Sequence, residues 1–168
     1  MKTTTNQERI ECIVLKNTPY KENDMIIHVY SLQFGKIGIH AKGVRKLTSK
    51  SAPGCLSLTK SYMDILLKKG MSSLIRSESI NHYRRIKENI DCEIIANVIL
   101  EYFYRYIEDN SPSLKHYQFL MESLEALNNG YSPLLVYLMF LVYVLKNEGI
   151  DLEVDSCVYC CRKVSNWI

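Results

Sequence analysis

The sequence predicts an α+β protein in which a small five-stranded barrel over residues 1–80 precedes a helical bundle over residues 81–168. Two observations lead to this prediction. Apolar residues recur at every second position before residue 80, as in half-buried strands, and at a helical period after residue 84. The charge balance changes at the same point, because residues 1–80 hold 13 Lys and Arg against 6 Asp and Glu, whereas residues 81–168 hold 8 against 12.

Five short strands account for the first unit. Alternating apolar residues predict strands around residues 10–14, 26–34, 36–42, 57–68 and 72–79, with a hairpin turn at Phe34-Gly35-Lys36 and a reversal near Lys69-Gly70. Five strands without an intervening helix must close or stack to cover their edges. This favours a small barrel of the oligonucleotide-binding (OB) type, and a small SH3-like barrel is the alternative.

Three helices are expected in the second unit. An apolar stripe over residues 86–106 predicts the first helix, which ends before Asn110. Ser111-Pro112 can cap a second helix over residues 114–127, and Ser132-Pro133 begins a third.

The third helix is apolar nearly all round, as far as Leu145. A helix of this composition is usually buried, so we expect it at the centre of the bundle. The aromatic residues Tyr102, Phe103 and Tyr106 are expected in the core rather than on a base-stacking surface, because aromatic stripes at helical spacing are usually packing residues.

A cationic surface is expected on the barrel. Residues 25–63 contain no Asp or Glu, and the cationic side chains of the strand over residues 36–42 point away from its apolar ones. The loop over residues 42–50 combines four cations with hydroxyl residues and with Gly43, which predicts a turn or a bulge after Lys42. This composition suits phosphate binding, and a merely solvated basic loop is the alternative. The candidate nucleic-acid-binding residues are Lys36, His40, Lys42, Arg45, Lys46 and Lys50.

Cysteines near the end of the chain form a second candidate site. Cys157-Val-Tyr-Cys160, with Cys161 directly behind it, has the spacing of half a zinc site. The second half usually follows after about 15 to 20 residues, but only seven residues remain. Zinc is therefore a candidate cofactor of Cys157 and Cys160, held by an incomplete site. The residues Cys12, Cys55 and Cys92 are expected to be buried as small hydrophobes.

Enzymatic chemistry is not indicated. The four histidines are widely separated, there is no Gly-x-Ser-x-Gly motif, and a metal-dependent enzyme would need acids that residues 25–63 lack. The longest apolar run has twelve residues, too few to span a membrane, and residues 1–11 carry no signal-peptide pattern. We therefore expect a reduced, cytoplasmic binding protein.

Several motifs occur in a recognisable order. They are Ile13 to Lys16, Tyr20-Lys-Glu22-Asn-Asp24, Gly35, Ala41-Lys42-Gly43-Val44-Arg45-Lys46, Gly149-Ile-Asp-Leu and Cys157-x-x-Cys160. This order resembles the RecO family of DNA repair proteins. The resemblance implies a recombination mediator that binds single- and double-stranded DNA, anneals complementary strands and, with RecR, helps RecA load onto strands coated by single-stranded-DNA-binding protein.

The resemblance also implies that the helical domain receives the acidic, apolar-ended tail of that coat protein, and that the protein is associated with the nucleoid. The available cations on that half are Arg84, Arg85, Arg105 and Lys115. Family members usually continue for several tens of residues, so the chain looks truncated. An exposed apolar face of the helix over residues 133–147 is expected to cause reduced solubility or self-association relative to a full-length relative. The alternative function is a generic RNA- or single-strand-binding OB module without a role in recombination.

Overall fold

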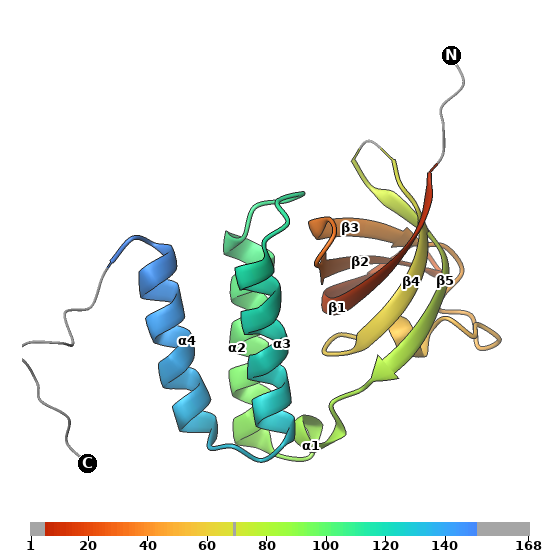
Figure 1. The fold of residues 1–168 in the computed structure, drawn as a ribbon. Helices are drawn as coiled ribbons and strands as arrows, with labels where there is room; N and C mark the ends of the chain where they lie inside the picture. Colours follow the sequence, from red (N-terminus) through yellow and green to blue (C-terminus); the bar gives the residue numbers. More distant parts are fainter. Residues whose placement is uncertain (1–5, 69, 151–168) are drawn as a thin grey trace, which may run out of the picture.

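The computed structural model describes residues 6–68 and 70–150. Five strands are hydrogen-bonded into a closed barrel in the order β1-β2-β3-β5-β4, and the helices stand beside it (Figure 1). The elements of the barrel are β1 (Gln7–Tyr20), β2 (Asp24–Ser31), β3 (Gly35–Ala41), the 3-10 helix η1 (Pro53–Cys55), β4 (Lys60–Leu66) and β5 (Ser72–Asn81). All strand pairs are antiparallel except the short β3–β5 pair. The predicted OB-type barrel is confirmed.

The barrel core follows from the alternation of side chains along each strand. In β3, for example, Ile37, Ile39 and Ala41 are buried in the interior, whereas His40 points outward. The core consists of Ile10, Cys12, Val14, Ile27, Val29, Ile37, Ile39, Ala41, Val44, Cys55, Met63 and Ile65. The burial of this apolar surface is the main favourable contribution to the stability of the barrel.

Within residues 70–150, four helices follow the barrel, rather than the predicted three. They are α1 (Arg84–Lys87), α2 (Ile90–Tyr106), α3 (Leu114–Asn128) and α4 (Pro133–Asn147). The predicted first helix is divided because the Asn89 side chain accepts hydrogen bonds from the N–H groups of Asp91 and Cys92 and so starts a new helix. In the same way Ser113, and not Ser111, caps α3 by accepting from the N–H of His116.

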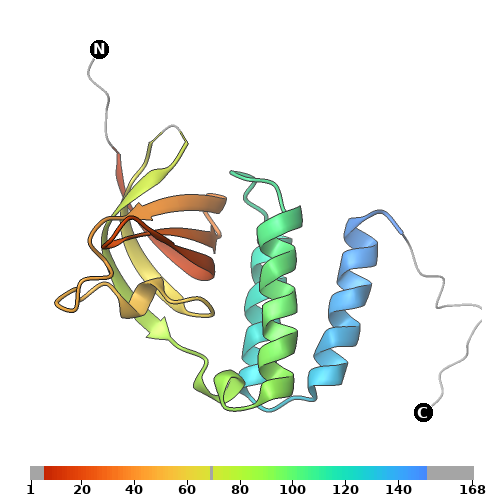
Figure 2. The same ribbon diagram turned by 180° about the vertical axis from the view of Figure 1, so that it is seen from behind.

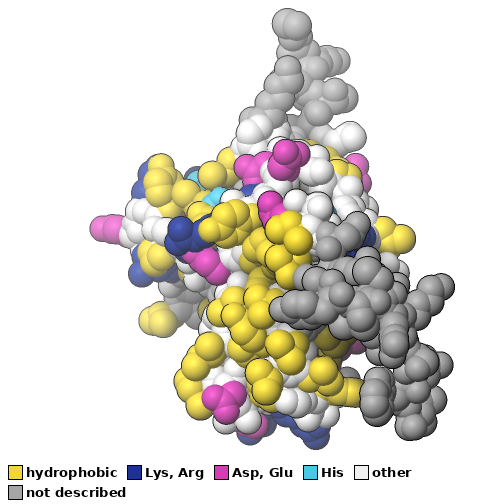
Figure 3. Space-filling model, turned by 90° about the vertical axis from the view of Figure 1, so that its left-hand side faces the viewer, with side chains coloured by type: hydrophobic (Ala, Val, Ile, Leu, Met, Phe, Trp, Pro, Cys, Tyr) yellow, Lys and Arg dark blue, Asp and Glu magenta, His cyan; other side chains and the backbone are white. Residues whose placement is uncertain are grey.

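The helix α4 lies at the outer side of the bundle, and the expectation that it is central was wrong. The helices α2 and α3 stand next to the barrel, and α4 stands beyond them (Figures 1 and 2). It buries Val136, Phe140 and Tyr143. Its exposed hydrophobic residues are Leu134, Leu135, Leu138, Met139, Leu141 and Val142. Figure 3 looks at the side of the molecule where α4 stands and shows hydrophobic side chains gathered there. Self-association stays a prediction, which a monodisperse monomer in light scattering would contradict.

Two further expectations concern single side chains. Tyr102 and Phe103 are buried in the helical core as predicted, but Tyr106 is 70% exposed and stacks on Tyr102 from outside. The cysteines at positions 12, 55 and 92 are all buried.

Among the described residues, no helix combines the length and the apolar character that crossing a membrane requires.

Candidate nucleic-acid interface

The basic loop, residues 42–50, is fixed to the barrel by Asp24 at the start of β2. One carboxylate oxygen of Asp24 accepts a hydrogen bond from the N–H of Gly43 at 2.8 Å, and the other lies 2.9 Å from Nε2 of His40. The N–H of Gly43, together with His40, holds the pKa of Asp24 below its usual range. Gly43 has a φ of +66°, so the predicted turn after Lys42 is confirmed and favours glycine there.

The turn between β1 and β2 holds the next part of the loop. The N–H of Arg45 donates to the carbonyl oxygen of Asn23 at 2.9 Å, and its guanidinium donates to the carbonyl oxygen of Glu22 at 3.2 Å. Val44, between these contacts, is buried in the barrel core. The first half of the loop is therefore folded onto the barrel.

Four cations of the basic loop are exposed together: Lys42, Arg45, Lys46 and Lys50. Within residues 6–68 and 70–150, none of these four forms an ion pair with a carboxylate. Their charge is consequently available to an external anion. The arrangement can hold phosphate groups along the edge of the barrel without reading bases.

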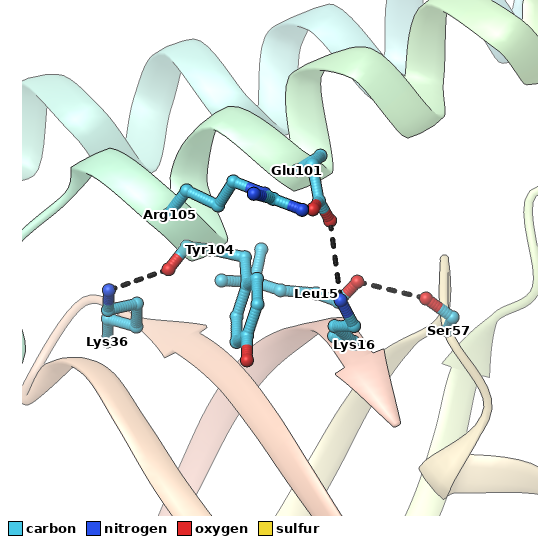
Figure 4. A network of polar contacts seen from close by, with 7 residues as sticks. All are labelled: Leu15, Lys16, Lys36, Ser57, Glu101, Tyr104 and Arg105. Atoms are coloured by element: carbon cyan, nitrogen blue, oxygen red, sulfur yellow. Dashed lines mark hydrogen bonds and ion pairs between the residues drawn. The ribbon is translucent and has the colours of Figure 1, made fainter. Parts of the chain in front are cut away.

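Lys36 does not belong to this exposed surface, which corrects the sequence-based assignment. Its side chain points outward from β3 as predicted, but the end of α2 covers this part of the barrel, and Lys36 is only 8% exposed. Its ammonium group donates to the carbonyl oxygen of Tyr104 at 2.8 Å (Figure 4). It also lies 3.1 Å from a carboxylate oxygen of Asp109. Lys36 therefore joins the barrel to the helices. His40 is half-buried against Asp24 at the border of the basic loop.

Backbone contacts complete the junction between the barrel and the helices. The N–H of Asn110 donates to the carbonyl oxygen of Lys36 at 2.9 Å. Gly35 has a φ of +65°, and a Cβ atom on it would lie 2.4 Å from the carbonyl oxygen of Ser111. Only glycine fits this position, because both the backbone conformation and the close approach exclude a side chain.

A groove of about 920 Å³ lies between α2, α4 and the rim of the barrel. Its walls are mostly apolar, and its charged residues are Lys16, Glu101 and Arg105. Glu101 pairs with both cations, with Lys16 at 3.8 Å (Figure 4). Arg105, and to a smaller extent Lys16, hold the pKa of Glu101 below its usual range. The groove can bind an apolar chain end that carries negative charge.

The role of Asp24 was not predicted from the sequence. The available signal was its place as the last acid before a long acid-free stretch, but the pairing of β2 with β3 is needed to place it beside Gly43. Cys157 and Cys160 lie outside the described residues. Within the described ranges, no three His, Cys, Asp or Glu side chains come together as metal ligands, so the zinc assignment stays a prediction.

Comparison with known proteins matches both halves of the chain. Residues 1–83 match the family model described as recombination protein O N terminal, and residues 88–166 match the one described as recombination protein O C terminal. A relative named DNA repair protein RecO, from Listeria monocytogenes serotype 4b, is 29% identical over 91% of this chain and 60% of its own length.

Two further relatives carry the same name. The protein from Listeria welshimeri serovar 6b is 28% identical over 91% of this chain and 60% of its own length. The protein from Bacillus cytotoxicus is 27% identical, and the match covers 91% of this chain and 62% of the relative. The chain thus spans about 60% of the length of the curated relatives that it matches.

Proposed function

Because this chain belongs to the RecO family, we propose that it acts in DNA repair and homologous recombination by binding single- and double-stranded DNA through the basic loop. The observation that supports this proposal is a group of four exposed cations, on a loop anchored to the barrel, that form no ion pair with any carboxylate in the described part of the chain. Phosphate contacts of this kind release counterions and carry no base information. We therefore expect binding that depends strongly on salt and little on sequence. The proposal includes no catalytic turnover.

Strand annealing follows from the same charge. Two polyanionic strands that bind one cationic surface repel each other less and reach a higher local concentration. Base pairing then supplies the driving force and the specificity. In the proposed role the protein acts in the cytoplasm at the nucleoid and, with RecR, helps RecA load onto strands coated by single-stranded-DNA-binding protein.

The groove between α2 and α4 is the proposed docking place for the tail of that coat protein. The tail is acidic and ends in apolar residues, and the groove offers apolar walls next to the cations Lys16 and Arg105. Of the four cations proposed from the sequence, Arg105 lines the groove, whereas Arg84 pairs with Glu88 on the exposed side of α1. An acidic ligand would compete with Glu101 for the two cations.

The proposal is tested by charge reversal in the basic loop. In the variant with Lys42, Arg45 and Lys46 changed to Glu, we expect affinity for labelled single-stranded DNA to fall at least about tenfold. The salt slope, log affinity against log salt, should decrease by about 2, since each lost phosphate contact removes about 0.7. Fluorescence anisotropy at several salt concentrations measures both quantities.

The matched control carries the same charge change on the helices, with Arg85, Lys115 and Lys146 changed to Glu. All three are exposed, and we expect this control to keep the salt slope of the wild type. If the loop variant keeps its affinity and slope, or if both variants lose them equally, the assignment to the basic loop is wrong. A preference for RNA over DNA, without any response to RecR, would instead favour the generic RNA-binding module.

A further inference from the structure

The strand register places rows of outward-facing side chains across β1, β2 and β3. Cross-strand partners lie on the same face of a sheet, so the register identifies these rows. They are Ile13, Tyr30 and Lys36; Lys16, His28 and Gly38; Thr18, Ile26 and His40; and Tyr20 with Asp24. The first row is covered by the helices, where Tyr30 and Lys36 are buried. The second is partly covered, since His28 meets the ring of Tyr104.

Where the helices do not cover them, members of these rows form a group at the barrel surface together with Met71. We call this group the open face: Tyr20, Ile26, Gly38, His40 and Met71. Tyr20 is 43% exposed and Met71 41% exposed, and Ile26 and His40 are half-buried. None of the five belongs to the buried cores of the barrel or the helical bundle.

The ring of Tyr20 is held in a defined orientation. It meets the ring of His40 edge to face, with 5.7 Å between the ring centroids, and His40 is in turn held by Asp24 at 2.9 Å. The ammonium group of Lys21 lies 5.3 Å from the centroid of the Tyr20 ring. An exposed aromatic ring that is fixed in this way can stack on a flat ligand with little loss of side-chain entropy.

Gly38, which pairs with His28 and lies two residues before His40 on β3, adds no side chain to the open face. A Cβ atom there would meet the His28 ring at 3.7 Å and the Met71 methyl group at 4.0 Å, which are ordinary contacts, and the φ of Gly38 is not in the left-handed region. Neither crowding nor backbone conformation therefore requires this glycine. Glycine inside a strand weakens it, and one common reason for its presence is the close approach of a ligand.

Cations border the open face on opposite sides. Lys21 lies in the turn between β1 and β2, and Lys42 follows the end of β3. On the other side, Lys68 donates a hydrogen bond to Ser73, which pairs with His40 in the β3–β5 register. All three lysines are exposed, so phosphates on either side of the open face would meet a positive charge.

We infer that the open face stacks the unpaired bases of a single nucleic-acid strand, with Tyr20 as the stacking residue and with Lys21, Lys42 and Lys68 on its phosphates. This inference rests on the proposed DNA-binding function and adds a preference for single strands, because a duplex hides the faces of its bases. Aromatic stacking is tolerant of sequence, since every base has a π face. His40 acts as a positioning residue that orients the Tyr20 ring.

The test compares two labelled oligonucleotides of about 15 units, a length near the upper limit for one OB domain. One is oligo-dT, and the other is an abasic strand with the same number of phosphates. We expect the wild type to bind oligo-dT more tightly. The variant Tyr20→Ala should lose about fivefold or more of its oligo-dT affinity and keep its affinity for the abasic strand, whereas Tyr20→Phe should retain both.

The matched control is Tyr62→Ala, which removes another exposed tyrosine from the barrel, on β4, where Arg9 lies over the ring. It should leave the affinity for both oligonucleotides unchanged. A second variant, Gly38→Val, adds to the open face a side chain that suits a strand. It should weaken oligo-dT binding by about fivefold and spare the abasic strand.

The outcomes separate the inference from the proposed function. If the wild type binds neither oligonucleotide, DNA binding itself is overturned. If it binds both equally well, or if Tyr20→Ala weakens both strands equally or neither, the DNA-binding function stands and the stacking role of Tyr20 is wrong.

Discussion

Lys36 shows how a charged side chain is accommodated where the barrel meets the helices. Its ammonium group has a carbonyl oxygen and a carboxylate as partners, so the cost of burial is offset by charge-assisted hydrogen bonding. The carboxylate partner is Asp109, whose side chain is 70% exposed. Water would therefore still solvate this carboxylate if Lys36 were removed. The two partners should therefore respond differently to substitution.

The variant Lys36→Ala should lower the free energy of unfolding by about 1–3 kcal/mol, because it removes a charged hydrogen bond at a covered site. The variant Asp109→Asn should cost at most about 1 kcal/mol, as for an exposed ion pair. Urea denaturation measures both, and DNA affinity should not change in either folded variant. If the Lys36→Ala variant keeps its stability but loses DNA affinity, Lys36 belongs to the DNA-binding surface and the correction made above is wrong.

Glu101 forms ion pairs with both cations of the groove, Lys16 and Arg105. The variant Glu101→Gln releases Lys16 and Arg105, so an acidic peptide with an apolar C-terminal end should bind about two- to fivefold more tightly, the range expected for an exposed ion pair. The control Glu122→Gln changes an exposed acid on α3 that does not line the groove. Peptide anisotropy provides the measurement, and equal effects of the two variants would exclude the groove as the docking place.

The basic loop depends on Asp24 for its conformation. Asp24→Ala removes the acceptor for the Gly43 N–H and the partner of His40. We expect trypsin to cleave after Lys42, Arg45 or Lys46 about fivefold faster, because local opening of the loop becomes easier. Mass spectrometry of the fragments identifies the sites, and cleavage at an unchanged rate would show that the loop is held by its other contacts alone.

The strands and most helix ends could be predicted because their signals are local. Alternation along β3 places Ile37, Ile39 and Ala41 inside from the sequence alone. The position of α4 could not be predicted in this way. A helix that is apolar all round can pack against other helices on any of its sides. Which side is covered depends on the packing order of α2, α3 and α4.

The candidate site was predictable only in part for the same reason. The cations of residues 42–50 are adjacent in sequence, so their common exposure follows from one loop. The burial of Lys36 and the role of Asp24 depend on contacts between distant segments, since Tyr104 and Gly43 reach them only in the folded molecule. Local patterns predicted which residues point outward, and tertiary packing decided which of them meet solvent.

The stability of the whole molecule should decrease on mild acidification. Burial lowers the pKa of both His28 and His116, and Lys115 adds to the effect at His116. Below the ordinary histidine pKa of about 6.5, the unfolded chain binds protons that the folded chain does not. Stability is therefore fully present above that value and falls as the pH decreases toward 5.

Thermal melts between pH 7.5 and pH 5, a range chosen to span the ordinary histidine pKa of about 6.5, measure this effect. The melting temperature of the wild type should fall across the range, and that of a variant with His28 and His116 both changed to Gln should fall less. Asp24, whose pKa is lowered, contributes only to a separate loss nearer pH 4, where the unfolded carboxyl group takes up its proton. Parallel pH profiles of the wild type and the double variant would contradict the role of the histidines.

Gly35 brings the barrel and the segment after α2 together at backbone distance. In the proposed function, this close packing helps to set the distance between the groove, which would hold the tail of the coat protein, and the basic loop, which would bind the DNA strand. A tail held in the groove would tether its own DNA near the barrel, so the transfer of the strand becomes an intramolecular step at a raised effective concentration. A side chain at position 35 would push the barrel and the helices apart, and this would change the distance over which the DNA strand is transferred.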